Sequence, residues 1–206
     1  MNSGQKKRPS KKDKREAILQ ASWKLIRHYG YNKTTVEDIA QSAGVGKGTV
    51  YLHFRSKAEI MLALTDLTNQ RITRDLEQIA AKQDAPPADR LRECLLHRIM
   101  TLFDIVHRYP HSEDVIASLL PEIVQRLERY VQRHGELLGE IMRQGNASGD
   151  LAVDDPAATG QLLADMFELL TPPHYRFRSR KALEQFANQT FDLLLAGLEN
   201  HGRKTP

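Results

Sequence analysis

The segment AGVGKGTVYLHFRSK, residues 43–57, decides how this sequence is interpreted. Its GVGKGT portion invites comparison with a phosphate-binding P-loop, in which a glycine, four further residues and then Gly-Lys-Ser/Thr wrap a nucleotide phosphate. Counted back from Gly46 and Lys47, the first glycine of that pattern would fall on Gln41, and Gly48 stands where Ser or Thr is required. The residues before the segment also have helical rather than strand spacing. The glycines therefore need an explanation other than a nucleotide.

Helical spacing of apolar residues extends outward from this segment along the whole chain. Short helices are expected on both sides of Gly44, the first of them opened by a capping box at either Thr34 or Thr35. Longer helices are expected over residues 13–29, 56–83, 89–109, 121–144, 156–170 and 179–200, with a shorter one at 114–119. No segment alternates with period two over strand length. The sequence predicts an all-α protein.

Composition indicates an ordinary globular chain, with 40% hydrophobic and 27% charged residues among 206. The single cysteine, Cys94, excludes an internal disulfide and points to a reducing compartment. The basic start MNSGQKKRPSKKDKR is not followed by the apolar region of a secretory signal. No run approaches the length of a membrane span. We expect a cytoplasmic protein with no membrane partner.

Charge is distributed unevenly along the chain. Residues 1–57 carry 13 lysines and arginines against 4 acidic residues, whereas residues 58–206 carry 17 against 22. The N-terminal part would suit a polyanion such as nucleic acid, or an anionic membrane surface. Residues 1–12 are expected to form a basic flexible arm, although a lysine-rich tail can also be simply solvated.

Two short helices joined by an Ala-Gly-Val turn account for the glycines. Such a pair, with a basic arm ahead of it, forms a helix-turn-helix whose second helix enters the DNA major groove. Gly44 would supply the left-handed turn residue, Gly46 would cap the second helix, and Gly48 would let its first turn approach the DNA backbone. The alternative is a tight corner in a helical bundle. A corner does not need the polar and basic residues that follow on the exposed side: Lys47, Thr49, Tyr51, His53, Arg55 and Lys57.

Residues 30–64, GYNKTTVEDIAQSAGVGKGTVYLHFRSKAEIMLAL, resemble the DNA-binding domain of the TetR family of bacterial transcriptional regulators, of the AcrR-like kind. The resemblance covers roughly residues 13–64 and departs from the family at Gly46, where Ser is usual. It implies an N-terminal three-helix helix-turn-helix domain over 13–58, followed by a larger helical ligand-binding and dimerisation domain over 59–206.

The resemblance also implies which side chains contact DNA. Phosphate contacts carried over from the family fall on Thr35, Tyr51, His53 and Lys57. Contacts to base edges or the groove fall on Lys47, Gly48 and Thr49, with Leu52 near a thymine methyl group. The partner would be double-stranded DNA with a palindromic operator, bound by a homodimer.

The last two predicted helices carry more apolar residues than a two-helix hairpin can hide, and the corresponding helices of the family form the dimer interface. The residues expected there are Leu162, Met166, Phe186, Phe191, Leu194 and Leu198.

An unknown small-molecule effector is expected in the C-terminal domain. It would be mainly apolar, with at most one anionic or hydrogen-bonding group to meet Arg98 or a histidine. These side chains could instead simply fill a core, because periodicity does not distinguish a core from a pocket. The candidate residues are His97, Arg98, Met100, Phe103, His107, Met166, Phe167 and Tyr175.

Catalysis and metal binding lack a supporting motif. The histidines at positions 107 and 111 have helical ligand spacing, but Pro110 interrupts them, and neither Gly-x-Ser-x-Gly, His-Glu-x-x-His nor Cys-x-x-Cys occurs. We therefore expect no catalytic residue, metal or cofactor. Together with the helix-turn-helix pattern, the family resemblance implies a transcriptional repressor that an effector releases from DNA. The alternative is a DNA-binding architectural or assembly protein of the same fold without an effector.

Overall fold

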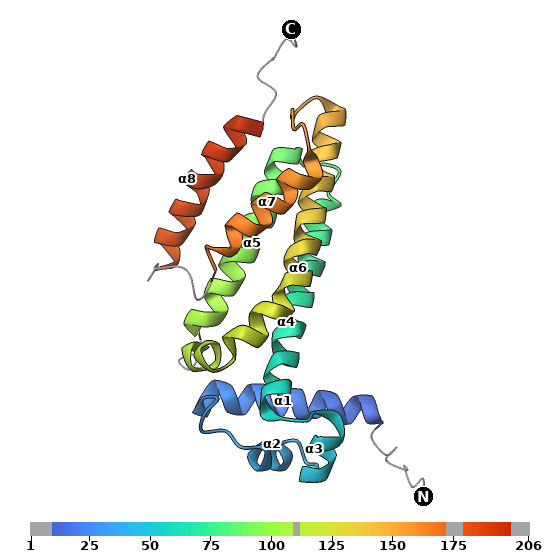
Figure 1. The fold of residues 1–206 in the computed structure, drawn as a ribbon, viewed down its shortest axis with the longest axis vertical. Coiled ribbons are helices and arrows are strands. Elements are labelled where there is room, and N and C mark those ends of the chain that lie inside the picture. Colours follow the sequence, from blue (N-terminus) through green and yellow to red (C-terminus); the bar gives the residue numbers. More distant parts are fainter. Residues whose placement is uncertain (1–9, 109–111, 172–178, 199–206) are drawn as a thin grey trace, which may run out of the picture. The chain divides into compact units, whose positions relative to one another are not determined.

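The computed structural model describes residues 10–108, 112–171 and 179–198, and within these ranges it contains helices and no strand (Figure 1). This confirms the predicted all-α class. The helices are α1 (Lys11–Tyr29), α2 (Val36–Ser42), α3 (Lys47–His53), α4 (Lys57–Ala80), α5 (Pro87–Arg108), α6 (Ser112–Ser148), α7 (Pro156–Glu168) and α8 (Arg180–Leu198).

The chain divides into two compact units, and the division differs from the predicted boundary at residue 58. One unit comprises residues 1–67 and 109–123, and the other comprises residues 68–108 and 124–206. Helices α4 and α6 contribute residues to both units, because each continues through a boundary. Helix α4 runs through the division between residues 67 and 68 without a Gly or a Pro, so the sequence does not mark that boundary.

The first unit is built on α1, α2 and α3, each of which packs against the other two. Helix α1 begins at Lys11, two residues before the predicted start, because Ser10 forms a capping box with Asp13. The Ser10 hydroxyl accepts from the Asp13 N–H at 3.2 Å, and the Asp13 carboxylate accepts from the Ser10 N–H at 2.7 Å. The last two residues of the expected arm therefore lie in a helix, and residues 1–9 lie outside the described part.

The turn between α2 and α3 has the predicted geometry. Thr35, and not Thr34, caps α2 in a capping box with Asp38. Gly44 has φ +66°, the left-handed conformation that a turn at this position requires. Val50 and Phe54 point into the core of the first unit, as their spacing predicts.

In the second unit, α5 packs against both α7 and α8 (Figure 1). Two separate helices were expected at 114–119 and 121–144, but α6 spans both with a kink at Leu119, whose φ of −132° and ψ of 17° are not helical. Pro121 lacks a backbone donor and its ring obstructs the preceding turn, which explains the kink. The helix resumes because its apolar stripe continues into the core of the second unit.

Helices α6 and α7 meet backbone to backbone at glycines. A Cβ atom on Gly160 would lie 2.5 Å from the Gly135 carbonyl oxygen and 2.6 Å from the Gly139 nitrogen. Only glycine fits at this crossing.

Candidate functional site

The solvent-facing side of α3 presents several of the residues predicted to contact DNA. Leu52 is 79% exposed and Tyr51 is about half exposed, although both are large side chains. A Cβ atom on Gly48 would meet nothing within 4 Å, so the first turn of α3 is open to another molecule. Thr49 is half-buried beside Gly48, and Thr35 is exposed at the start of α2. Leu52 and Tyr51 therefore present apolar surface on the exposed side of α3.

Lys47, at the start of α3, is already engaged by a carboxylate. Its ammonium forms a hydrogen-bonded ion pair with Glu37 on α2 and lies 6.0 Å from the centre of the Tyr51 ring. The hydrogen bond from Lys47 lowers the pKa of Glu37, and the same bond raises the pKa of Lys47. Both side chains remain more than half exposed. Lys47 can therefore reach DNA, but only by leaving or sharing Glu37.

Lys57, at the start of α4, points into the first unit. Its ammonium donates to the carbonyl oxygens of Tyr31 at 2.6 Å and Thr34 at 2.9 Å, and it lies 4.2 Å from the centre of the Tyr31 ring. Burial lowers the pKa of Lys57. Lys57 therefore holds the loop between α1 and α2 against α4. This structural role is additional to the predicted phosphate contact.

Basic residues of α1 border the end of α3. Burial lowers the pKa of His53, and the positive charges of Lys11, Arg15 and Lys14 lower it further. The Arg15 guanidinium lies 5.0 Å from the centre of the Phe54 ring. These three basic residues were not among the predicted DNA contacts. Their spacing of three and four residues, which places them on one face of a helix, is the signal that could have found them.

In the second unit, several predicted effector residues lie in the core instead of lining a cavity. Met100, Phe103 and Phe167 are buried there. The His107 ring stacks on Phe103 with 3.7 Å between centroids. The His97 ring nitrogen lies 3.0 Å from the Asp75 carboxylate. Tyr175 falls outside the described residues.

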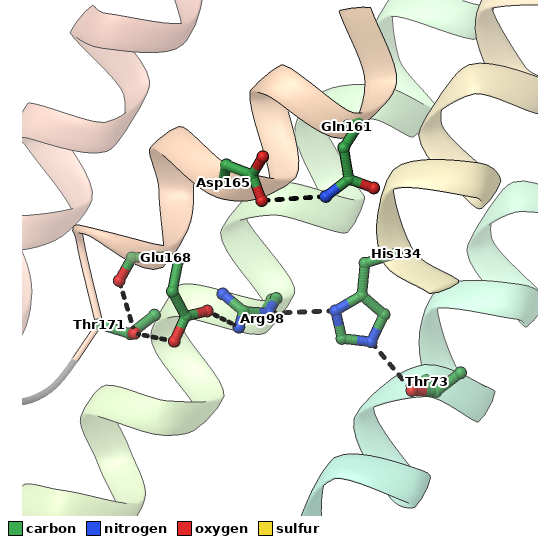
Figure 2. Close-up of polar contacts among 7 residues, drawn as sticks. All are labelled: Thr73, Arg98, His134, Gln161, Asp165, Glu168 and Thr171. Atoms are coloured by element: carbon green, nitrogen blue, oxygen red, sulfur yellow. Dashed lines mark hydrogen bonds and ion pairs between the residues drawn. The ribbon is translucent and has the colours of Figure 1, made fainter. Parts of the chain in front are cut away.

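Arg98 belongs to a buried polar chain that crosses four helices (Figure 2). Its Nε donates to Nδ1 of His134 on α6 at 3.2 Å, and its Nη2 is ion-paired with Glu168 on α7. Because Nδ1 of His134 accepts, the proton of the neutral ring sits on Nε2, which donates to the Thr73 hydroxyl on α4 at 2.9 Å. Burial lowers the pKa of His134 to about 3, and the charges of Arg98 and Arg133 contribute. His134 was not among the predicted site residues, although it lies within the apolar stripe of its helix.

Two hollows open on the second unit. One of about 380 Å³ lies between α6 and α7 and is lined by Val124, Leu127, Glu128, Val131, Gln161, Asp165, Glu168 and Leu169. The other, of about 480 Å³, lies between α5 and α8 and has mainly charged and polar walls. The second includes two predicted effector residues, His97 and Met100. The first is lined by none of the predicted effector residues.

The predicted dimer residues fall into three groups by their exposure. Leu162, Met166 and Phe186 are exposed, Leu162 at 57% of its surface, and Leu194 and Leu198 are half-buried. Phe191 is only 1% exposed, so it offers almost no surface to a second copy. Its ring packs edge-on to Phe167 inside the chain's own core, with 6.3 Å between centroids.

The described residues give no support to a metal site, a reactive thiol or a membrane-spanning helix. Among those residues no group of three His, Cys, Asp or Glu side chains could hold a metal ion. Cys94 is buried, and burial raises the pKa of its thiol to about 12, so it stays protonated. None of the described helices is long and apolar enough to span a membrane.

Comparison with family models gives two matches. Residues 18–64 match the model described as bacterial regulatory proteins, tetR family. Residues 87–189 match the model described as tetracyclin repressor-like, C-terminal domain. The matches fall on the helix-turn-helix and on most of the second unit.

Relatives and solved structures agree with these models. The chain is 26% identical over 199 residues to the fatty acid metabolism regulator protein of Bacillus subtilis, covering 92% of this chain and 98% of that protein. It is 29% identical over 192 residues to the HTH-type transcriptional regulator AcrR of Shigella flexneri, covering 87% and 81%. A TetR/AcrR-family regulator from Thermobifida fusca has the same fold, with a TM-score of 0.70, 23% identity and coverage of 90% and 98%. So does SmeT of Stenotrophomonas maltophilia in complex with triclosan, with a TM-score of 0.66, 21% identity and coverage of 94% and 95%.

Proposed function

Because the chain belongs to the TetR family of bacterial regulatory proteins, and is thus a DNA-binding transcriptional regulator and not an enzyme, we propose that it represses transcription from a palindromic operator. Two copies bind as a homodimer, and a small, mainly apolar effector held by the second unit lowers their affinity for DNA. A bacterial regulator works where the chromosome lies, so we place it in the cytoplasm.

The observation that carries this proposal is the outer side of α3. Gly48 leaves the backbone of the first turn open, Leu52 projects an apolar side chain, and Tyr51 adds a hydroxyl. The basic start of α1 lies beside the end of the same helix. An open helix with both apolar and polar groups, flanked by positive charge, suits base-edge contacts in the groove and phosphate contacts at its rim.

The homodimer rests on the apolar surface of α7 and α8. Leu162, Met166 and Phe186 are exposed on these helices, and so is Leu193, which is 80% exposed. A water-soluble monomer rarely leaves such a set of large apolar side chains uncovered. A second copy that packs the same helices against them would cover both sets at once, as a two-fold axis requires.

An effector of mainly apolar character is supported by the relatives. One of them is named as a regulator of fatty acid metabolism, and another was solved with triclosan. Triclosan is a small, mainly apolar molecule, so the second name agrees with an effector of this class. The hollow between α6 and α7, with four apolar lining residues, has a volume within the range of small-molecule sites.

Selection of duplexes from a random pool, followed by footprinting, tests the DNA part of the proposal. We expect an enriched palindrome whose half-sites lie about one helical turn, or 34–36 Å, apart. Lys47→Ala and Thr49→Ala should relax discrimination between that operator and random DNA by roughly 1–3 kcal/mol. A protein that enriches no sequence would contradict the proposal.

The effector part needs a separate measurement. Apolar small molecules are screened for thermal stabilisation of the protein and then for release of the selected operator. A molecule that does both supports the proposal. If stabilising molecules leave operator affinity unchanged, the architectural alternative without an effector becomes the better description.

A further inference from the structure

The hollow between α6 and α7 combines apolar walls with an excess of negative charge. Its apolar lining comes from Val124, Leu127 and Val131 on α6 and from Leu169 beyond the end of α7. Its charged lining comes from Glu128 on α6 and from Asp165 and Glu168 on α7. None of its described lining residues is Lys, Arg or His. The walls therefore favour a ligand that is apolar over most of its surface and positively charged.

The three carboxylates have different partners. Glu168 is ion-paired with Arg98, whose side chain is only 5% exposed. Asp165 accepts a hydrogen bond of 2.9 Å from the side-chain amide of Gln161, a neutral donor (Figure 2). The amide leaves the negative charge of Asp165 in place. Because Arg98 balances the charge of Glu168, the hollow retains the negative charges of Asp165 and Glu128.

We propose that this hollow binds a lipophilic monocation, with its apolar part against the leucines and valines and its charge between Asp165, Glu128 and Glu168. A carboxylate attracts a cation and repels an anion of the same shape, and the difference grows when apolar groups exclude water from the pair. The proposal gives the effector a chemical class and rests on the proposed function for its effect on DNA. It departs from the expected anionic group, because Arg98 already has Glu168 as its partner.

Glu168 connects the hollow with the buried polar chain. One carboxylate oxygen is ion-paired with Arg98, and the other accepts from the Thr171 hydroxyl at 3.1 Å. The Nη1 atom of Arg98 is buried without a hydrogen-bond partner. A cation beside Glu168 competes with Arg98 for the same carboxylate. Arg98 has few other hydrogen bonds that could replace this ion pair. The response passes through His134 to Thr73, so α4, α5, α6 and α7 all adjust.

Tetraphenylphosphonium and tetraphenylborate test the proposal, because they have nearly the same size and shape and opposite charge. Each is titrated into the full-length protein in a calorimeter at fixed ionic strength. We expect the phosphonium ion to bind at least about tenfold more tightly than the borate ion. Asp165→Asn and Glu128→Gln should each weaken phosphonium binding severalfold. Both side chains are exposed, so neither change should unfold the protein.

Glu140→Gln is the matched control, because Glu140 is an exposed carboxylate on α6 that pairs with Arg143 and does not line the hollow. The proposal is overturned if neither ion binds, if both bind equally, or if the control weakens phosphonium binding as much as Asp165→Asn. Random-duplex and operator binding are measured in parallel. Charge-selective binding that leaves DNA affinity unchanged supports the site and contradicts the effector role, so the two failures can be told apart.

Discussion

The ammonium of Lys57 lies 2.6 Å from the carbonyl oxygen of Tyr31, where it ties the first turn of α4 to the loop that follows α1. The resemblance to the family implies that Lys57 contacts a DNA phosphate. The geometry adds a structural role, since two of its three hydrogen-bond donors are used inside the domain. One donor remains for a phosphate.

Lys57→Ala should therefore destabilise the protein as well as weaken DNA binding. Losing charge-assisted bonds to two carbonyl groups costs about 2 kcal/mol, to be measured as the free energy of unfolding in urea. Lys33→Ala is the control, because Lys33 is an exposed lysine of the same loop. If Lys57→Ala and the control have equal free energies of unfolding, Lys57 has no structural role and contributes only the phosphate contact.

Glu37 should restrain binding to DNA by holding Lys47. Glu37→Gln removes the ion pair, so the positive charge of Lys47 becomes fully available to the DNA groove. We expect severalfold tighter binding to random duplex DNA and a salt dependence steeper by about one unit, measured by fluorescence anisotropy. The effect should disappear when Lys47 is also changed to Gln.

Glu16→Gln separates this ion pair from a general change of charge. Glu16 is an exposed carboxylate on α1, hydrogen-bonded to Gln20 and not to Lys47. If Glu16→Gln tightens binding as much as Glu37→Gln, the ion pair has no special role.

How much the sequence could predict depends on the distance along the chain between interacting residues. The turn at Gly44 and the inward face of α3 involve residues a few positions apart, so local spacing was sufficient there. The same spacing left Thr34 and Thr35 as alternative caps of α2, and the structure selects Thr35. The partners of Lys57 lie 23 and 26 residues away, and no local pattern marks them. Phe191 shows another limit, because periodicity identifies an apolar face without showing whether it packs on the same chain or on a partner.

Because Phe191 is buried, the dimer interface is better tested at exposed apolar residues of α7 and α8. Leu162→Glu or Phe186→Glu places a charge on the apolar surface of α7 or α8 and should yield monomers with reduced operator affinity in analytical ultracentrifugation and binding assays. Thermal stability of the monomer should change little, because these side chains contribute less to the chain's own core. Phe191→Asp should instead unfold the second unit, since it buries a charge in that core.

Leu52→Glu controls for the loss of any exposed apolar residue, because Leu52 lies on α3. It should weaken DNA binding and leave the dimer intact. Monomers in that variant, or dimers in Leu162→Glu and Phe186→Glu, would contradict the interface proposed on α7 and α8.

Gly160→Ala should destabilise the second unit. The added methyl group would meet the backbone of Gly135 and Gly139, which cannot move aside as a side chain can. Forcing α6 and α7 apart costs roughly 1–3 kcal/mol. Gly48→Ala is the control, because it also lies in a helix but has open space at its Cβ position. It should be neutral or stabilising by up to about 1 kcal/mol, and equal melting temperatures for the two variants would argue against the close crossing.

His134 should make stability depend on pH below the range where histidine ordinarily titrates. Its pKa is about 3 in the folded protein, compared with 6.5 for an unperturbed histidine. Between these values the unfolded chain binds a proton that the folded protein does not, so stability rises with pH and is lost as pH falls below about 6.5. The slope reaches about 1.4 kcal/mol per pH unit for this one group.

His134→Asn tests that dependence, because the amide can accept from Arg98 without titrating. Urea unfolding between pH 4.5 and 7.5, followed for both proteins, should give a stability curve that is flatter for the variant by close to one proton. The variant should be less stable at pH 7.5, since its shorter side chain packs less fully and reaches Thr73 poorly. Its disadvantage should shrink as the pH falls, because only the wild type must keep a buried histidine neutral. Parallel curves for the two proteins would mean that the ring takes up its proton in the folded state, with Arg98 and Thr73 rearranged around it.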